Sequence, residues 1–139
     1  MTIRSLCPGG GRLITNPDPY EPYLLSQAIK LGDLLFVSGQ AGYADDGQIV
    51  SGGFLPQGEQ AFANLRRALE AGGSGLEHVV KVTIFVTDMQ ANFKDVVTLR
   101  RKFWSQPYPA DTIVEVKALY NPEVMIEIDA IAAVPSREA

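Results

Sequence analysis

Strict alternation of residue character over residues 79–87 constrains the fold of this chain more than any other feature. Successive side chains of a β-strand point to opposite faces, so a period of two predicts a strand with one strongly buried face. Residues 125–134 alternate in the same way and predict a longer strand. The expected buried faces consist of Val80, Val82, Ile84 and Val86 in the first segment and of Ile126, Ile128, Ala130, Ala132 and Val134 in the second.

Two other segments have the spacing of amphipathic helices. Residues 57–71 place Phe62, Leu65 and Leu69 on one face, and the glycines after residue 71 end this helix. Asn92 is a good N-cap residue, so a second helix is expected to begin there. The apolar stripe of the second helix consists of Phe93, Val96, Val97, Leu99 and Phe103.

Weaker strand signals complete the order of elements. Residues 29–38 predict two strands around the turn Gly32-Asp33, and residues 112–119 predict another strand. The order of strands, helix, strand, helix and two strands is typical of an α+β fold with two helices on one face of a mixed sheet. We expect one domain over residues 1–139, with an irregular segment at 1–22 and a core at about 23–134.

The counts of reactive and charged residues exclude several functional classes. One Cys and one His cannot form an internal disulfide or the usual zinc ligand set, so we expect a cytoplasmic protein without a metal or other cofactor. A catalytic triad would have to use His78. The net charge of −4 argues against nucleic acid as a partner. No apolar run is long enough to span a membrane.

Five segments in succession resemble the RidA (YjgF) family of reactive-intermediate deaminases. The resemblance extends over roughly residues 23–134, and the order and spacing of the segments carry it rather than any one tripeptide. The segments are Ser26-Gln27-Ala28-Ile29-Lys30 leading into Phe36-Val37-Ser38-Gly39-Gln40; Asn64-Leu65 with Leu69 and Gly72; Val79-Val80-Lys81-Val82-Thr83-Ile84-Phe85-Val86-Thr87-Asp88-Met89; Pro109-Ala110 before Val114-Glu115-Val116; and Ile126-Glu127-Ile128-Asp129-Ala130-Ile131-Ala132.

The resemblance implies a fold, an assembly and a reaction. The fold is chorismate-mutase-like, with a six-stranded sheet and two helices on one face. Family members form homotrimers whose sheets make a central barrel, and a small-molecule substrate binds in a cleft between subunits. The family hydrolyses enamines or imines to a carbonyl compound and ammonia.

The resemblance also implies site residues. Glu127 falls where the family has a carboxylate that positions water, and Ser38, Gly39 and Gln40 fall on a segment that lines the pocket. Four other family side chains are replaced. Asp111 stands in place of an Arg that clamps the substrate carboxylate, Ile113 in place of a Cys, Leu25 in place of a Tyr and Val97 in place of an Asn.

The replaced arginine leads to the main hypothesis about chemistry. If Asp111 and Glu127 both face the cleft, two close carboxylates repel a substrate carboxylate, and one of them acquires a raised pKa, so that the pair could serve as an acid and a base. Alternatively, Asp111 turns to solvent or pairs with an Arg or Lys of a neighbouring subunit. Arg100 could reach the same pocket from the second helix, or lie on the surface.

Three functions remain open from the sequence. The first is a divergent imine or enamine hydrolase whose substrates are not the standard 2-imino acids. The second is a trimeric binding protein with a degenerate site. The third, which the acidic balance disfavours, is the ribonuclease or translation-inhibitor activity sometimes attached to the family.

Overall fold

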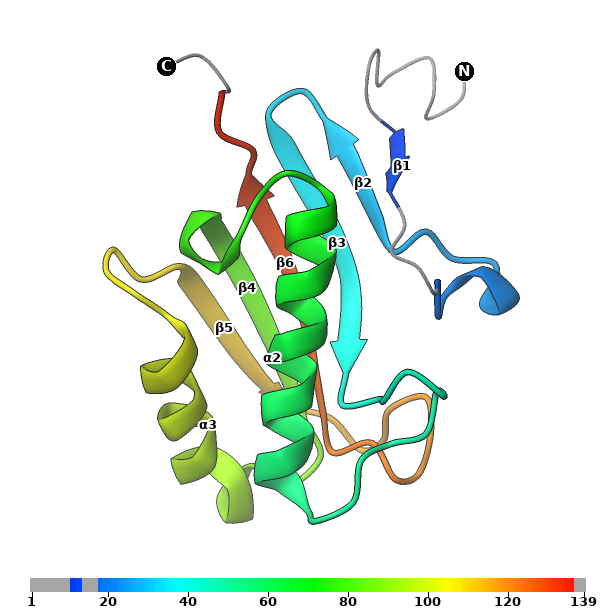
Figure 1. The fold of residues 1–139 in the computed structure, drawn as a ribbon. Coiled ribbons are helices and arrows are strands. Elements are labelled where there is room, and N and C mark those ends of the chain that lie inside the picture. Colours follow the sequence, from blue (N-terminus) through cyan, green and yellow to red (C-terminus); the bar gives the residue numbers. More distant parts are fainter. Residues whose placement is uncertain (1–10, 14–17, 137–139) are drawn as a thin grey trace.

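A six-stranded mixed sheet forms the centre of the computed structural model, which describes residues 11–13 and 18–136 (Figure 1). The order of the strands across the sheet is β1-β2-β3-β6-β4-β5. All neighbours are antiparallel except β4 and β5, which are parallel. The strands are β1 (Gly11–Leu13), β2 (Ala28–Leu31), β3 (Leu34–Ala41), β4 (Val79–Val86), β5 (Ala110–Glu115) and β6 (Ile126–Ala133).

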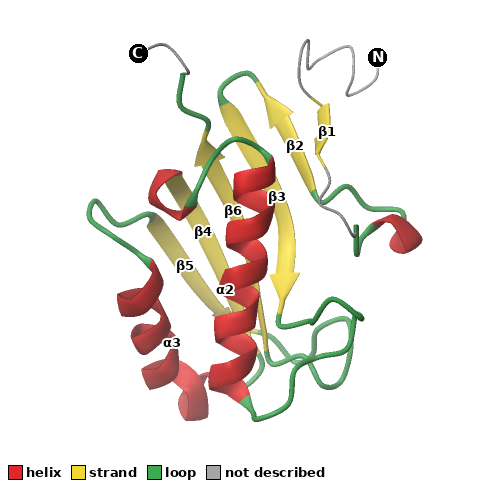
Figure 2. Ribbon diagram, in the orientation of Figure 1, coloured by secondary structure: helices red, strands yellow, loops and turns green. Residues whose placement is uncertain are grey.

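Two helices, α2 (Phe54–Ala71) and α3 (Met89–Phe103), cover one face of this sheet (Figure 2). Two short 3-10 helices, η1 (Glu21–Tyr23) and η2 (Leu76–His78), lie in the connections before β2 and β4. The expected α+β class with two helices on one face is therefore confirmed. The strand β1 has only three residues, so five strands make up the body of the sheet.

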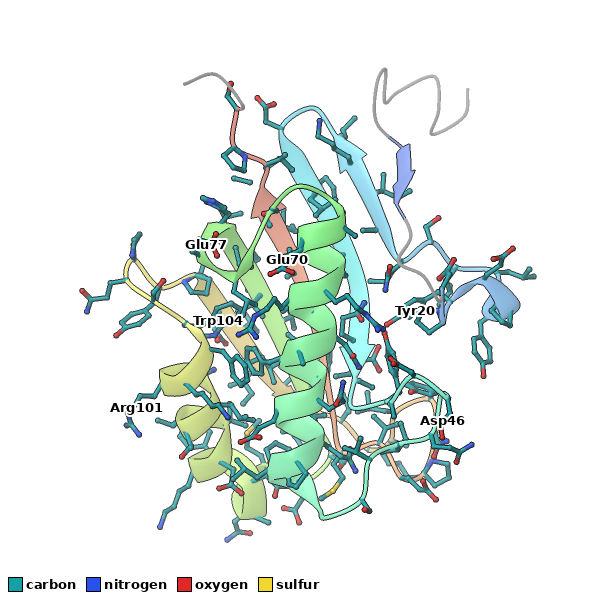
Figure 3. The ribbon with its side chains drawn as sticks, viewed as in Figure 1. Tyr20, Asp46, Glu70, Glu77, Arg101 and Trp104 are labelled. Carbon is teal, nitrogen blue, oxygen red and sulfur yellow. The ribbon has the colours of Figure 1, made fainter. Side chains whose placement is uncertain are left out.

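The core lies between the helices and the covered face of the sheet. Leu65 of α2 is fully buried in one cluster with Ile84 of β4 and Ile128 of β6. At the end of α3, the ring of Phe103 stacks on Phe62 with centroids 4.6 Å apart. Trp104 meets Phe62 edge-on, and Figure 3 shows it between the two helices. Burial of this apolar surface is the main force that holds both helices on the sheet.

The start of α3 differs from the sequence prediction. Asp88, not Asn92, is the N-cap, and its carboxylate accepts a hydrogen bond from the backbone N–H of Ala91 at 3.1 Å. Asn92 is buried within the first turn. The helix starts earlier because β4 ends at Val86, and Asp88, two residues later, supplies a capping carboxylate before Asn92 is reached.

Both strands of the parallel pair, β4 and β5, also depart from the simple pattern. A register shift between Val79 and Lys81 buries Val79 and leaves Val80 48% exposed, so the expected inward position of Val80 is wrong. The strand β5 covers Ala110–Glu115 rather than 112–119, since its only partner, β4, ends at Val86 opposite Glu115. An edge strand lasts only as long as its neighbour provides hydrogen bonds.

The N-terminal prediction needs a similar correction. Residues 11–13 form β1, within the segment expected to be irregular, because they pair with Ala28–Lys30 of β2. Cys7 and the remainder of the glycine run before β1 lie outside the described residues. Within residues 11–13 and 18–136, no helix has the length and apolar character that a membrane crossing requires.

Candidate functional site

A β-bulge on β3 creates the most distinctive local geometry on the open face of the sheet. Val37 pairs with Ala130 and Gln40 with Ile128, so three steps on β3 oppose two steps on β6. The extra residue lies in the Ser38-Gly39 segment. Ser38 is fixed by one backbone and one side-chain hydrogen bond. Its N–H donates to the carbonyl of Gln27 at 2.9 Å, and its hydroxyl donates to the carbonyl of Ser26 at 2.6 Å.

Buried polar side chains form hydrogen bonds with the backbone of this bulge. The hydroxyl of Tyr20 donates to the carbonyl of Gly39 at 2.5 Å. The amide of Gln40 donates to the carbonyl of Ser38 at 3.0 Å and accepts from the hydroxyl of Tyr43 at 2.7 Å. The two tyrosine hydroxyls lie 3.2 Å apart, and their rings meet edge-on. The N–H of Ser38 and the carbonyls of Ser38 and Gly39 each have a hydrogen-bond partner, and these bonds restrain the bulge.

Glu127 lies over this bulge. It belongs to β6, opposite Ala41 of β3 and Phe85 of β4. Its carboxylate occupies the space that a side chain at residue 39 would need, since a Cβ placed on Gly39 would overlap the Glu127 Oε1 atom. Any larger residue at position 39 would therefore have to displace the Glu127 carboxylate, whereas the backbone angles of Gly39 do not themselves demand glycine.

The electrostatic surroundings of Glu127 favour a proton on its carboxyl group. Burial raises its pKa, and the negative charge of Asp129, two residues along β6, raises it further. Burial also raises the pKa of Tyr20, and it raises the pKa of Tyr120 to about 12. The negative charge of Glu127 contributes to both of these shifts. Glu127 is thus near enough to the phenol groups of Tyr20 and Tyr120 to interact with both electrostatically. Figure 3 shows Tyr20 beside β3 on the side of η1.

Within one chain, Asp111 and Glu127 do not form the expected pair of carboxylates. In the parallel register of β4 and β5, Asp111 lies beside Val82, whose side chain is buried under the helices. Glu127 lies beside Phe85 on the same strand, three positions further along, and therefore faces the opposite side of the sheet. The sequence shows that each strand alternates, but the register between strands decides which residues share a face.

Asp111 binds Arg100 of its own chain instead. The Nε and Nη2 atoms of Arg100 donate to the two carboxylate oxygens at 2.9 and 2.7 Å, in the planar bidentate geometry that arginine favours. The pair joins α3 to the edge strand β5. The expected alternatives, in which Asp111 turns to solvent or pairs with a neighbouring subunit, and Arg100 lies free on the surface, do not describe this arrangement.

The other expected site residues are distributed over several parts of the molecule. Ile113 packs against the core on the helix-covered face. Val97 is half-buried on α3. Leu25 is half exposed and lines a shallow hollow of about 410 Å³ with Glu21, Leu24 and Ser26. The side chain of Gln40 has no exposed surface, so it supports the bulge and does not line a site.

Sequence reasoning missed the tyrosines around Glu127. Tyr20 lies in a proline-rich segment and Tyr120 in the loop between β5 and β6, so neither belongs to a periodic pattern. Only the approach of these two segments in three dimensions brings them to the same strand end, where Leu119 and Val124 pack against Tyr20 and Tyr43. No group of three or more His, Cys, Asp or Glu residues in the described part of the chain could hold a metal ion.

Comparisons with known proteins define the family. The family described as endoribonuclease L-PSP matches residues 13–134. The RutC family protein y4sK of Sinorhizobium fredii is 41% identical over 116 residues, which cover 83% of this chain and 89% of that protein. A 2-iminobutanoate/2-iminopropanoate deaminase of Dermatophagoides farinae is 32% identical over 119 residues, covering 85% and 90%.

Solved structures agree with this assignment. The crystal structure of YEO7_yeast superposes with a TM-score of 0.84 at 33% identity and covers 91% of this chain and 99% of that one. The fold and the sequence therefore define an α+β protein of the endoribonuclease L-PSP class. The chain belongs to the RidA (YjgF) family that its segments resemble.

Proposed function

We propose that this protein hydrolyses C=N bonds of imines or their enamine tautomers and releases ammonia, with Glu127 as the group that activates water. The observation that carries the proposal is the position of Glu127: a partly buried carboxylate with a raised pKa, set over the rigid bulge at Gly39 on the open face of the sheet. A relative named 2-iminobutanoate/2-iminopropanoate deaminase supports the same reaction class.

The reaction needs only one group that accepts and returns a proton. Glu127 takes a proton from water as the water oxygen adds to the imine carbon, and the C=N double bond becomes a single bond. Glu127 returns this proton to the nitrogen, which completes the carbinolamine. The proton of the carbinolamine hydroxyl then moves to the nitrogen as the C–N bond breaks and the C=O bond forms, so the products are a carbonyl compound and ammonia. A raised pKa suits this exchange, because it brings the carboxyl group nearer to the operating pH.

The substrates that we propose are not the standard 2-imino acids. The position that the family uses for its carboxylate clamp holds Asp111, and Asp111 occupies the guanidinium of Arg100 through two hydrogen bonds. A substrate carboxylate would have to compete with Asp111 for Arg100. We therefore expect 2-aminoacrylate and other amino-acid imines to be hydrolysed weakly or not at all.

We further propose that the chain works as a homotrimer whose open sheet faces form a barrel, with the site in the cleft between copies. The open face carries large apolar side chains that one chain leaves exposed, Leu34, Phe36 and Val114 among them. Apolar groups in such number on one face favour association. Sedimentation analysis measures the assembly directly, and a monomer at micromolar concentration would contradict it.

Glu127→Gln is the decisive variant for the reaction. Ammonia release is measured with imines generated in place by an amine oxidase or an amino-acid oxidase. The substitution keeps the shape of the side chain but removes the proton acceptor, so turnover is expected to fall about 10²-fold or more. The matched control is Glu123→Gln, which removes one charge from an exposed position in the neighbouring loop. Equal turnover in both variants would contradict the role of Glu127.

A binding protein without chemistry is the second candidate, and the loss of four of the expected pocket groups favours it. The same variant separates the two candidates. An enzyme loses turnover and keeps its ligand when Glu127 becomes Gln, whereas the wild-type binding protein has no turnover with any imine tested.

Ribonuclease activity is a third candidate because of the description of the family. The chain has a single histidine, His78, which lies 3.5 Å from the carboxylate of Glu77 and on η2 rather than at the Glu127 site. RNA cleavage that persists after purification in high salt, and that Glu127→Gln abolishes, would favour this candidate over the hydrolase.

A further inference from the structure

The charges near Glu127 are negative or already engaged. Asp129 lies on the same face of β6, two residues further along. Lys81 is the basic side chain of this region of the sheet, and its ammonium group donates to the hydroxyl of Thr112 at 2.7 Å. Burial raises the pKa of Asp129, and the charge of Lys81 opposes that rise, so Lys81 acts on Asp129. Among the described side chains, the only charge that perturbs Glu127 is that of Asp129.

Arg100 of α3 does not face the Glu127 site. Arg100 lies on the helix-covered side, and both oxygens of Asp111 bind its guanidinium. Strands β2 to β6 contain no arginine, so these five strands offer an anionic ligand on the open face no guanidinium group.

Tyrosine side chains lie near the same carboxylate. Tyr20 approaches Glu127 from the segment before η1 and is fixed by its bond to Gly39. Tyr120 approaches from the loop before β6 and is 64% exposed. Tyr23 of η1, which is 74% exposed, is close enough to Tyr120 for the two phenols to interact electrostatically. Figure 3 shows Tyr20 on the side of β3 that faces η1.

We infer that the Glu127 site selects an organic cation, so that the substrate is a protonated iminium ion without a carboxylate group. The inference rests on the proposed function in taking Glu127 as the place where substrate binds. A carboxylate attracts the positive nitrogen, and tyrosine rings present the negative face of their π-systems to a cation. The carboxylate repels an anion. Neither the carboxylate nor the tyrosine rings attract a neutral molecule as strongly as they attract a cation.

This choice of ligand also suits the chemistry. An iminium carbon is more electrophilic than that of a neutral imine, so a site that holds the protonated form binds the reactive species. Addition of water to the iminium carbon, with Glu127 taking a proton from that water, gives a neutral carbinolamine. Transfer of the hydroxyl proton to the nitrogen then breaks the C–N bond and forms the carbonyl group, and the proton held by Glu127 passes to the released ammonia, which leaves as ammonium. The charge that Glu127 attracts is therefore present in the substrate and in the product.

The test uses a stable cation and its neutral isostere, so it does not depend on turnover. Choline, 3,3-dimethylbutan-1-ol and the anion 2-oxobutanoate are titrated into the full-length protein, and binding is followed by amide chemical shifts in NMR spectra. We expect choline to bind about tenfold more tightly than the alcohol, because a carboxylate and a partly desolvated ring add to its affinity. We expect 2-oxobutanoate to bind more weakly than both.

Variants assign the preference to individual groups. Glu127→Gln is expected to remove most of the advantage of choline over the alcohol. Tyr120→Leu is expected to reduce choline affinity about threefold, whereas Tyr120→Phe keeps the ring and retains the affinity. The control Glu123→Gln removes an equal charge from the loop and is expected to leave the preference unchanged. If Glu127→Gln does not fold, the Tyr120 pair of variants still tests the inference.

Two outcomes would overturn the inference: equal affinity for choline and the alcohol, or tighter binding of 2-oxobutanoate than of choline. The proposed function is judged separately by ammonia release. Choline selectivity without hydrolysis of any imine would refute the hydrolase and keep the cation site. Efficient hydrolysis of 2-imino acids without choline selectivity would refute the cation site and keep the hydrolase.

Discussion

The two faces of the sheet hold carboxylates in opposite electrostatic settings. On the helix-covered face, Asp111 is locked by two hydrogen bonds to Arg100, which neutralise its charge. On the open face, Glu127 lies beside Asp129 and two tyrosines, and burial raises its pKa. Because Arg100 neutralises Asp111 and the pair joins α3 to β5, the comparison favours Glu127 as the carboxylate of the proposed reaction.

The largest expected effect is on the free energy of unfolding, and it compares the packing of the two faces of the sheet. Ile128→Ala, on the covered face, is expected to lower the free energy of unfolding by about 2–5 kcal/mol, because it leaves a cavity in a closed core. Ile131→Ala, on the open face of the same strand, is the matched control. Its effect is expected to be smaller and to grow on dilution, because it weakens contact between copies. Equal, concentration-independent losses in denaturant unfolding would remove the distinction between the faces.

The next effect sharpens the description of the open face. Gly39→Ala is expected to lower the free energy of unfolding by about 1–3 kcal/mol, because the new methyl group meets the Glu127 carboxylate.

The Gly39→Ala effect has an internal control in a double-mutant cycle. In a Glu127→Ala background, the same glycine substitution is expected to cost little, since the obstructing atoms are gone. Thermal and denaturant unfolding of the four proteins measure the coupling. An additive result would show that Glu127 does not lie over Gly39.

A smaller effect tests the locked pair on the covered side. Asp111→Asn is expected to lower stability by about 1 kcal/mol, because the pair is bidentate and mostly shielded from solvent. Asp45→Asn, whose partner is Arg67, is the control at a site where the aspartate side chain is 82% exposed, and its effect is expected to be near zero. Exchange of the two residues, Arg100→Asp with Asp111→Arg, should restore part of the loss. Identical losses for Asp111→Asn and Asp45→Asn would argue against a special role of the bidentate geometry.

The smallest effect is a pH dependence of the open face. Because the folded-state pKa of Glu127 is raised above its ordinary value of 4.5, the folded chain binds more protons than the unfolded chain above that pH. Wild-type stability therefore falls as pH rises from about 4.5 through the folded-state pKa. Glu127→Gln is expected to be more stable than wild type at pH 7, with the gain fading toward pH 4. A gain that is constant with pH in thermal melts would point to packing instead of charge.

Much of the fold was predictable because it depends on local periodicity. The alternation in β4 and β6 and the stripe in α2 each concern neighbouring residues, so no knowledge of partners is needed. The errors occur where a partner decides. The bulge that exposes Val80, the early end of β5 and the pairing of β1 all depend on what lies alongside the strand.

The candidate site was predictable only in part. Glu127 and the Ser38-Gly39 segment follow from the family resemblance, and the structure brings them together. Asp111 was expected beside Glu127 because both lie on alternating strands at family positions. The pairing register, which one sequence does not reveal, places them on opposite faces. Tyr20 and Tyr120 belong to irregular segments, and no pattern marked them.

The sequence by itself determined which stretches form strands and helices, the α+β order and the family. These properties follow from the spacing of apolar residues and from ordered motifs along the chain. Only the tertiary structure decided which charges meet. Electrostatic interactions depend on distance and burial, so the pairing of Arg100 with Asp111, and the place of Glu127 among tyrosines, came from strand register and loop packing rather than from position in the chain.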